Sequence, residues 1–211
     1  MAAEVLSRNQ TDVRAVAMRR GRNLEYLTIG WNSLEAVAAV TAGVLAGSVA
    51  LVGFGIDSVI EVSSGAIILW RLFSGEHREK IALKLVGISL IALAAYVGFD
   101  AAKSLILRDT PEASYIGITI AALSLVVMPL LARAKRNVAA QLNSRAMMAD
   151  SKQTDICAYL SAILLSGLLF NALFGWWWAD PLAAVVMLPI IFKEGIEAMR
   201  GETCCDSDVC Y

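Results

Sequence analysis

Two pairs of polar residues lie inside apolar stretches of the sequence, and each pair has the spacing of about one helical turn. Asp57 and Glu61 form the first pair, and Ser151 and Asp155 form the second. Residues four positions apart share one face of a helix, and a carboxylate in hydrocarbon costs on the order of 2–3 kcal/mol. Oxygen ligands on two facing helices suit a divalent cation, because the ion neutralises carboxylates that would otherwise be buried uncompensated. The two pairs therefore indicate an ion site between two helices.

A purely structural role is the alternative for the same residues. The acids could pair with Lys152, which lies in the second of these stretches, or share a proton with one another, and so only hold helices together. Ionisable residues within a membrane usually mark a functional site. Two pairs at matching spacing on two helices favour the ion site over this alternative.

The composition is that of a membrane protein. Of the 211 residues, 58% are hydrophobic and 18% are charged, and the mean hydropathy is +0.64, whereas soluble domains are nearer 45–50% apolar. The net charge of −1 gives no reason to expect a nucleic-acid partner. Residues 1–23 are polar, contain five arginines and lack the apolar core of a signal peptide. We therefore expect a basic cytoplasmic N-terminal segment.

Six stretches are long and apolar enough to cross a lipid bilayer as helices, for which about 20 residues are needed. The breaks between them contain turn-forming residues, as in "FSGEHREK" and "RDTPEAS". "RAKRNVAAQLNSR" separates the fourth stretch from the fifth, and in "GWWWADP" Asp180 is expected to cap the sixth helix. We predict an all-α membrane protein with six transmembrane helices, at approximately residues 26–46, 48–71, 81–105, 114–132, 146–174 and 178–199.

The basic residues predict the orientation of these spans. Fifteen of the eighteen lysines and arginines fall in segments that would lie on one side of the membrane; Lys103 and Arg108 fall on the other, and Lys152 lies inside the fifth span. Cytoplasmic loops are the basic ones, so both termini are expected in the cytoplasm. The expected location is the plasma (inner) membrane, as an integral multi-pass protein. The fifteen are Arg8, Arg14, Arg19, Arg20, Arg22, Arg71, Arg78, Lys80, Lys84, Arg133, Lys135, Arg136, Arg145, Lys193 and Arg200.

Several classes of enzyme are excluded by the absence of their motifs. The sequence contains no GxxxxGK[ST] phosphate loop, no HExxH and no GxSxG. Its one histidine, His77, lies in a basic loop, so a histidine-based catalytic or metal centre cannot be assembled. We expect neither enzymatic activity nor a prosthetic group.

Three segments resemble the cation diffusion facilitator (cation efflux) family. "TAGVLAGSVALVGFGIDSVIEVSSG" resembles the family's small-residue turn and second helix, with its [H/D]-S-x-x-D pattern. "ADSKQTDICAYLSA" and "GWWWADPLAAVVMLPIIFKEG" resemble the fifth and sixth helices, with the H-x-x-x-D pair and the A-D-P entry. The resemblance covers residues 24–200, which would form a six-helix cation-efflux transmembrane domain.

The resemblance implies a transport site formed by Asp57, Glu61, Ser151 and Asp155. Glu61 stands where aspartate is usual, and Ser151 stands where many members have histidine. Asp150, one residue earlier, could supply the replacement oxygen if the helix is rotated or locally unwound. Without imidazole the site is harder, and it tolerates Mn²⁺ or Fe²⁺ better while still accepting Zn²⁺ or Co²⁺.

The family further implies efflux of a divalent metal cation in exchange for protons, and a possible homodimer. Lys152 would then be either a counter-charge to the empty site or a side chain extended toward the interface. A membrane metal-binding accessory or sensor protein that does not transport is the alternative function.

The chain departs from the family after the sixth helix. Most members continue into a cytoplasmic ferredoxin-like domain, whereas residues 201–211 are the cysteine-rich sequence "GETCCDSDVCY". Cys204, Cys205 and Cys210 are expected in the cytoplasm. They would either capture a soft or borderline cation or form an unstructured tail with no specific role.

Overall fold

Six helices make up the described part of the chain, which contains no strand. The computed structural model describes residues 2–74, 79–108, 111–142 and 144–200. His77 and the cysteines at 204, 205 and 210 lie outside these ranges. The helices are α1 (Ala2–Ala46), α2 (Val49–Ser74), α3 (Glu79–Leu107), α4 (Tyr115–Leu142), α5 (Arg145–Phe174) and α6 (Ala179–Arg200).

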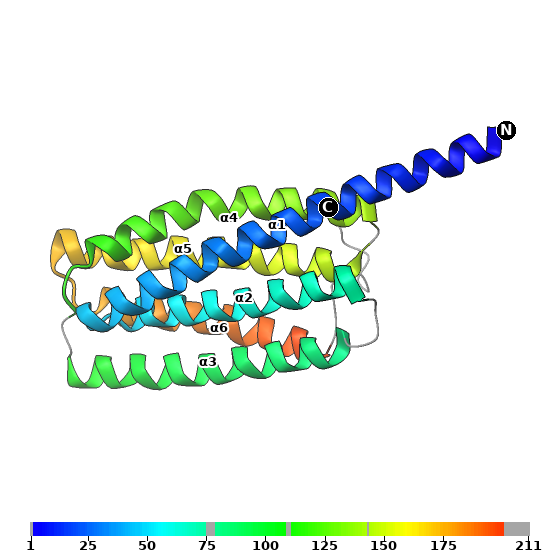
Figure 1. The fold of residues 1–211 in the computed structure, drawn as a ribbon. Coiled ribbons are helices and arrows are strands. Elements are labelled where there is room, and N and C mark those ends of the chain that lie inside the picture. The colour runs from blue at the N-terminus through cyan, green and yellow to red at the C-terminus, as the bar shows by residue number, and fades with distance from the viewer. Residues whose placement is uncertain (1, 75–78, 109–110, 143, 201–211) are drawn as a thin grey trace.

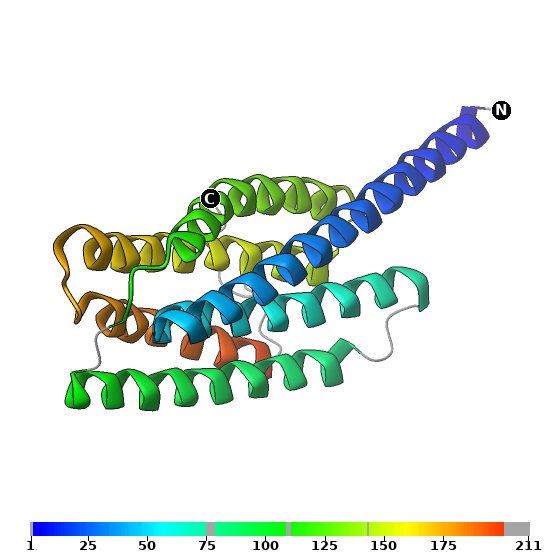
Figure 2. The ribbon, with the colours of Figure 1, turned by 60° about the vertical axis from the view of Figure 1, so that its left-hand side comes forward.

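The helices form an elongated bundle, with α2 in contact with four others. α1 packs against α2 and α4, α4 against α5, and α3 against α6, while α2 also contacts α3, α5 and α6. Figure 1 shows α1 running obliquely along the bundle, with its N-terminal part extending beyond the other helices, and Figure 2 shows the same extension from another side. Side chains on α2 are therefore placed to meet groups from most of the other helices.

Five of these helices, α1 to α5, are long and apolar enough to span a membrane within the described residues. The sixth predicted span is present as helix α6 but does not meet that criterion. It carries Asp180 near its start and Lys193, Glu194 and Glu197 toward its end, so its uncharged stretch is too short. Large apolar side chains such as Phe99 face outward, as expected in lipid.

Two segments expected to lie outside the spans are helical. α1 begins at Ala2, so the N-terminal basic segment is continuous with the first span. α4 continues to Leu142, so most of the predicted connection 133–145 belongs to that helix. Residues 133–142 contain neither glycine nor proline, and arginine, lysine, alanine and glutamine all favour helix. Hydropathy marks where the apolar stretch ends, which here is several residues before the end of the helix.

The turn between α1 and α2 is fixed by a carboxylate from α6. Gly47 adopts the left-handed conformation, with φ of 66°, which glycine accepts without strain. The Ser48 hydroxyl donates a hydrogen bond to Asp180, and the backbone N–H of Ala50 donates to the same carboxylate at 3.4 Å. Asp180 was expected to cap its own helix. It instead lies within the first turn of α6 and accepts hydrogen bonds at the N-terminus of α2, where free N–H groups and the helix dipole favour a negative charge.

Replacing Asp180 by alanine should therefore loosen the position of α2. We expect the Asp180→Ala variant to lose about 1–3 kcal/mol of stability, because the N-terminus of α2 and the buried Ser48 hydroxyl lose their acceptor. Chemical denaturation of the purified protein in detergent measures this loss. Glu112→Ala, which changes an exposed acid near the same end of the bundle, is the control. Equal stability of the two variants would contradict the proposed capping role.

Candidate cation site

A set of buried polar side chains, which we call the polar band, lies on the interior faces of four helices. On α1 they recur at the three- and four-residue spacing of one helix face, and α2, α4 and α5 each add further members. The members from these four helices are Glu25, Thr28, Asn32, Glu35, Asp57, Ser58, Glu61, Ser124, Lys135, Asp150, Ser151, Thr154 and Ser161. Polar groups buried in this number indicate a function beyond packing, because each costs free energy unless it is paired.

The predicted acidic pair of α2 lies within this polar band. Asp57 is 5% exposed and Glu61 is 1% exposed. The Thr154 hydroxyl of α5 donates a hydrogen bond of 2.8 Å to Oε1 of Glu61, while Oε2 of Glu61 has no hydrogen-bond partner. The Thr154 hydroxyl thus brings α5 into contact with the acidic pair of α2 at Glu61.

Asp150 also faces α2, but its main partner is a lysine of α4. Its carboxylate accepts a hydrogen bond of 2.5 Å from the Lys135 ammonium and one of 3.3 Å from the Ser64 hydroxyl. Lys135 lies 3.3 Å from the Glu25 carboxylate, and neither side chain is exposed. Lys135, which was predicted to lie in the connection between the fourth and fifth helices, is therefore an ion-pair partner in the interior.

The other two predicted ligands of α5 do not reach Glu61. The Ser151 hydroxyl is buried and donates to the carbonyl oxygen of Met148 at 2.7 Å. Asp155 has a 32% exposed side chain and pairs with Arg136 of α4. Successive residues of an α-helix are about 100° apart around its axis. With Thr154 turned toward Glu61, Asp155 is turned toward α4.

Glu35 of α1 adds a third carboxyl group beside the acidic pair of α2. Its side chain is 2% exposed, lies within electrostatic range of Asp57 and Glu61, and is beside the hydroxyls of Ser58 and Ser124. Neither carboxylate oxygen makes a hydrogen bond of normal geometry. The three acids lie in one region of the interior, although no group of three or more His, Cys, Asp or Glu among the described residues is arranged to hold a metal ion.

Four residues around the acidic pair were not predicted as site residues from the sequence: Glu25, Glu35, Lys135 and Thr154. Glu25 has the spacing of Asn32 and Glu35 along one face of α1, and that pattern could have revealed it. Lys135 could have been placed on the fourth helix if that helix had been extended according to the helix propensity of residues 133–142. The role of Thr154 depends on the rotation of α5 about its axis, which no local pattern in the sequence determines.

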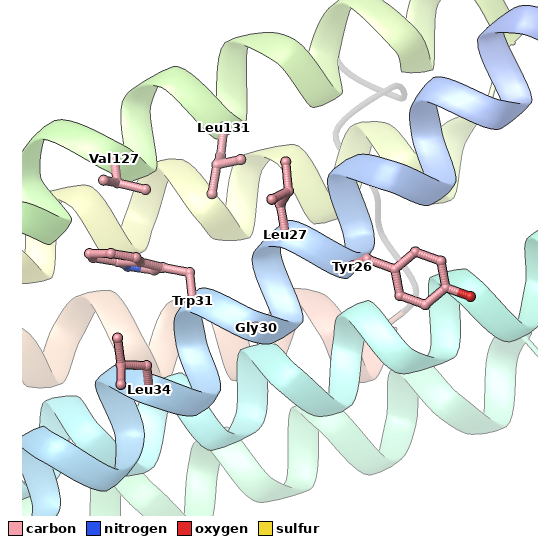
Figure 3. A pocket seen from close by; sticks show the side chains of 7 residues that line it. All are labelled: Tyr26, Leu27, Gly30, Trp31, Leu34, Val127 and Leu131. Carbon is pink, nitrogen blue, oxygen red and sulfur yellow. The ribbon is translucent and has the colours of Figure 1, made fainter.

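An apolar groove on the outer face of the bundle is separate from this polar band. It lies between α1 and α4 and is lined by side chains that include Trp31, Leu34 and Leu131 (Figure 3). Gly30, which has no side chain, also lines it. No acidic or basic side chain lines it. The groove therefore supplies no charged ligand for a metal cation.

The sequence matches the family described as the cation efflux transmembrane domain over residues 26–201. The chain belongs to this family. It is therefore an all-helical, integral, multi-pass membrane protein of the cation efflux class, as the resemblance in its second, fifth and sixth helices indicated.

Curated relatives agree with this assignment. Transmembrane protein 163 of Xenopus laevis is 28% identical over 182 residues, which cover 83% of this chain and 65% of the relative. Magnetosome protein MamB of Magnetospira is 27% identical over 87% of this chain and 67% of the relative. A cadmium, cobalt and zinc/H⁺-K⁺ antiporter of Bacillus velezensis is 27% identical over 62% of this chain and 41% of its own length. The chain thus spans roughly two thirds or less of the length of these relatives.

The hydrogen bond between Thr154 and Glu61 can be tested by an isosteric substitution. We expect Thr154→Val to cost about 1–3 kcal/mol of stability, because it leaves a buried glutamate without its donor. Thr119→Val is the matched control, since the hydroxyl of Thr119 is on the outside of α4 and bonds only its own helix, at 2.8 Å. Denaturation of both variants in detergent compares them. Similar losses in the two variants would show that the Thr154 hydroxyl does not stabilise the interior.

Proposed function

We propose that the protein transports divalent metal cations across a membrane, as an efflux system, through the carboxylates of α2. The observation that carries the proposal is the burial of Asp57 and Glu61, one helical turn apart, with Glu61 hydrogen-bonded to Thr154 of α5. A divalent cation would neutralise these two carboxylates, neither of which makes an ion pair with a basic side chain among the described residues. The family match supports a cation as the cargo.

The proposed ligand set is Asp57, Glu61, Asp150, Ser151 and Asp155. Asp150 and the hydroxyl of Thr154 contact α2 in this structure, whereas Asp155 pairs with Arg136. Rotation of α5 by about 100° would exchange Thr154 for Asp155 at the site. The same rotation would exchange Asp150 for Ser151, so that α5 would present either Asp150 and Thr154 or Ser151 and Asp155 to α2.

The proposed cargo is a first-row ion such as Zn²⁺, Mn²⁺, Co²⁺ or Fe²⁺. Carboxylate and hydroxyl ligands accept all four, and without imidazole the site is less selective for zinc. Carboxylates that release a metal take up protons, so exchange of metal for protons follows from the same groups. Antiport is also supported by the Bacillus velezensis relative, which is named a cadmium, cobalt and zinc/H⁺-K⁺ antiporter.

We further propose that both termini face the cytoplasm, in the plasma (inner) membrane, and that two copies associate. The excess of lysine and arginine at one end of the spans supports the orientation. The proposed homodimer rests on the resemblance to the family.

A non-transporting metal-binding accessory or sensor protein is the second candidate. It would bind a metal ion through the same buried carboxylates. Flux separates the two candidates, since a sensor binds metal without moving it.

Metal uptake into inside-out proteoliposomes that contain a metal-sensitive dye tests the transport function. We expect wild-type uptake of at least one of Zn²⁺, Mn²⁺, Co²⁺ and Fe²⁺, and at least a roughly tenfold lower rate for Asp57→Asn. Asp100→Asn, the same chemical change on α3 outside the polar band, should transport normally. Binding of metal with no uptake by the wild type would favour the sensor, and equal rates in the two variants would exclude Asp57 as a ligand.

A further inference from the structure

Lys135 is a buried cation held inside the polar band. Its ammonium contacts Asp150 at 2.5 Å and Glu25 at 3.3 Å, and it lies 3.4 Å from the Thr154 hydroxyl. Among the buried residues that the structure describes, it is the only basic one. These contacts come from α1 and α5, so a single side chain of α4 joins three helices.

The same ammonium is linked to the acidic pair of α2. Lys135 can donate to the Thr154 oxygen, and the Thr154 hydroxyl donates in turn to Oε1 of Glu61 at 2.8 Å. Glu61 and Lys135 also attract each other electrostatically. The positive charge therefore stabilises Asp150 directly and Glu61 through one hydroxyl.

A transported cation and this ammonium would need the same negative charges. Two cations a few ångströms apart in a poorly solvated interior repel each other strongly. A buried carboxylate left without any cation is also unfavourable. The empty site is consequently best satisfied by Lys135, and the loaded site by the metal ion.

We propose that Lys135 is a tethered counter-cation that competes with the transported divalent cation for the carboxylates of Asp150 and Glu61. This inference rests on the proposed transport function. The lysine occupies the site when no metal is present, lowers the affinity for the metal, and thereby promotes its release. This places on Lys135 the counter-charge role that the sequence suggested for Lys152, whose side chain is half-buried on α5.

Competition and a merely structural role predict opposite effects of removing the lysine charge. If Lys135 only holds helices together, its loss should disorder the site and weaken metal binding. If it competes, its loss should strengthen binding, because the metal no longer has to displace it. Slower release should accompany the stronger binding.

Isothermal titration of the full-length purified protein with Zn²⁺ and Mn²⁺ separates these outcomes. We expect Lys135→Gln to bind about tenfold more tightly than the wild type, which corresponds to ~1.4 kcal/mol, and to transport more slowly in proteoliposomes. Lys135→Arg should stay near the wild-type affinity, since it keeps the charge. Lys152→Gln, the same change two positions after Asp150, should also bind like the wild type.

Removing one member of a buried ion pair can prevent folding, so a second variant is required. Lys135→Met combined with Glu25→Gln removes one positive and one negative charge and leaves Asp150 for the metal. It should also bind more tightly than the wild type. Unchanged or weaker affinity in a folded variant of either kind would overturn the competition.

Wild-type behaviour distinguishes failure of this inference from failure of the transport function. Wild-type flux with no tightening in the Lys135 variants would reject the competition alone. Absence of both metal binding and flux in the wild type, with no binding gained in the Lys135 variants, would reject the transport function and the competition together.

Discussion

Buried carboxylates on α2 impose the constraint on which the rest of the interior depends. Asp57 and Glu61 lie within the bundle, where a carboxylate without a partner is costly. The surrounding helices reduce this cost with hydroxyls and one ammonium. These groups do not fully satisfy the acids, because Oε2 of Glu61 lacks a hydrogen-bond partner. An interior that is polar yet incompletely paired suits an ion that enters and leaves.

The position of α2 is held by close packing as well as by polar contacts. A Cβ atom added to Gly53 would lie 2.8 Å from a methyl group of Val97 on α3, and one added to Gly55 would lie 2.7 Å from a methyl group of Val40 on α1. Glycine at these positions lets the backbones approach, as is common where membrane helices meet. Together with the Asp180 carboxylate at the N-terminus of α2, these contacts hold α2 in the orientation that turns Asp57 and Glu61 into the bundle.

The sequence was informative where a pattern is local and less so where helices must be oriented. Apolar length located all six helices, and four-residue spacing identified Asp57 and Glu61 as one buried face. The same spacing on α5 suggested Ser151 and Asp155, but the structure turns Asp150 and Thr154 toward α2. That rotation is set by contacts with α2 and α4, including the Arg136–Asp155 pair, and not by the sequence of α5 alone. Lys135 was missed because the apolar stretch used to predict the fourth helix ends at residue 132, whereas the helix continues to Leu142.

The first shell of atoms around a bound metal tests the central claim most directly. X-ray absorption spectroscopy at the zinc edge, on full-length protein loaded with one equivalent of Zn²⁺, reports the ligand type. A carboxylate site between the helices predicts a shell of oxygen atoms at about 2.0–2.2 Å that is lost in the Asp57→Asn variant. Sulfur atoms at about 2.3 Å, unchanged by that substitution, would place the metal on cysteines and contradict a carboxylate site in the interior.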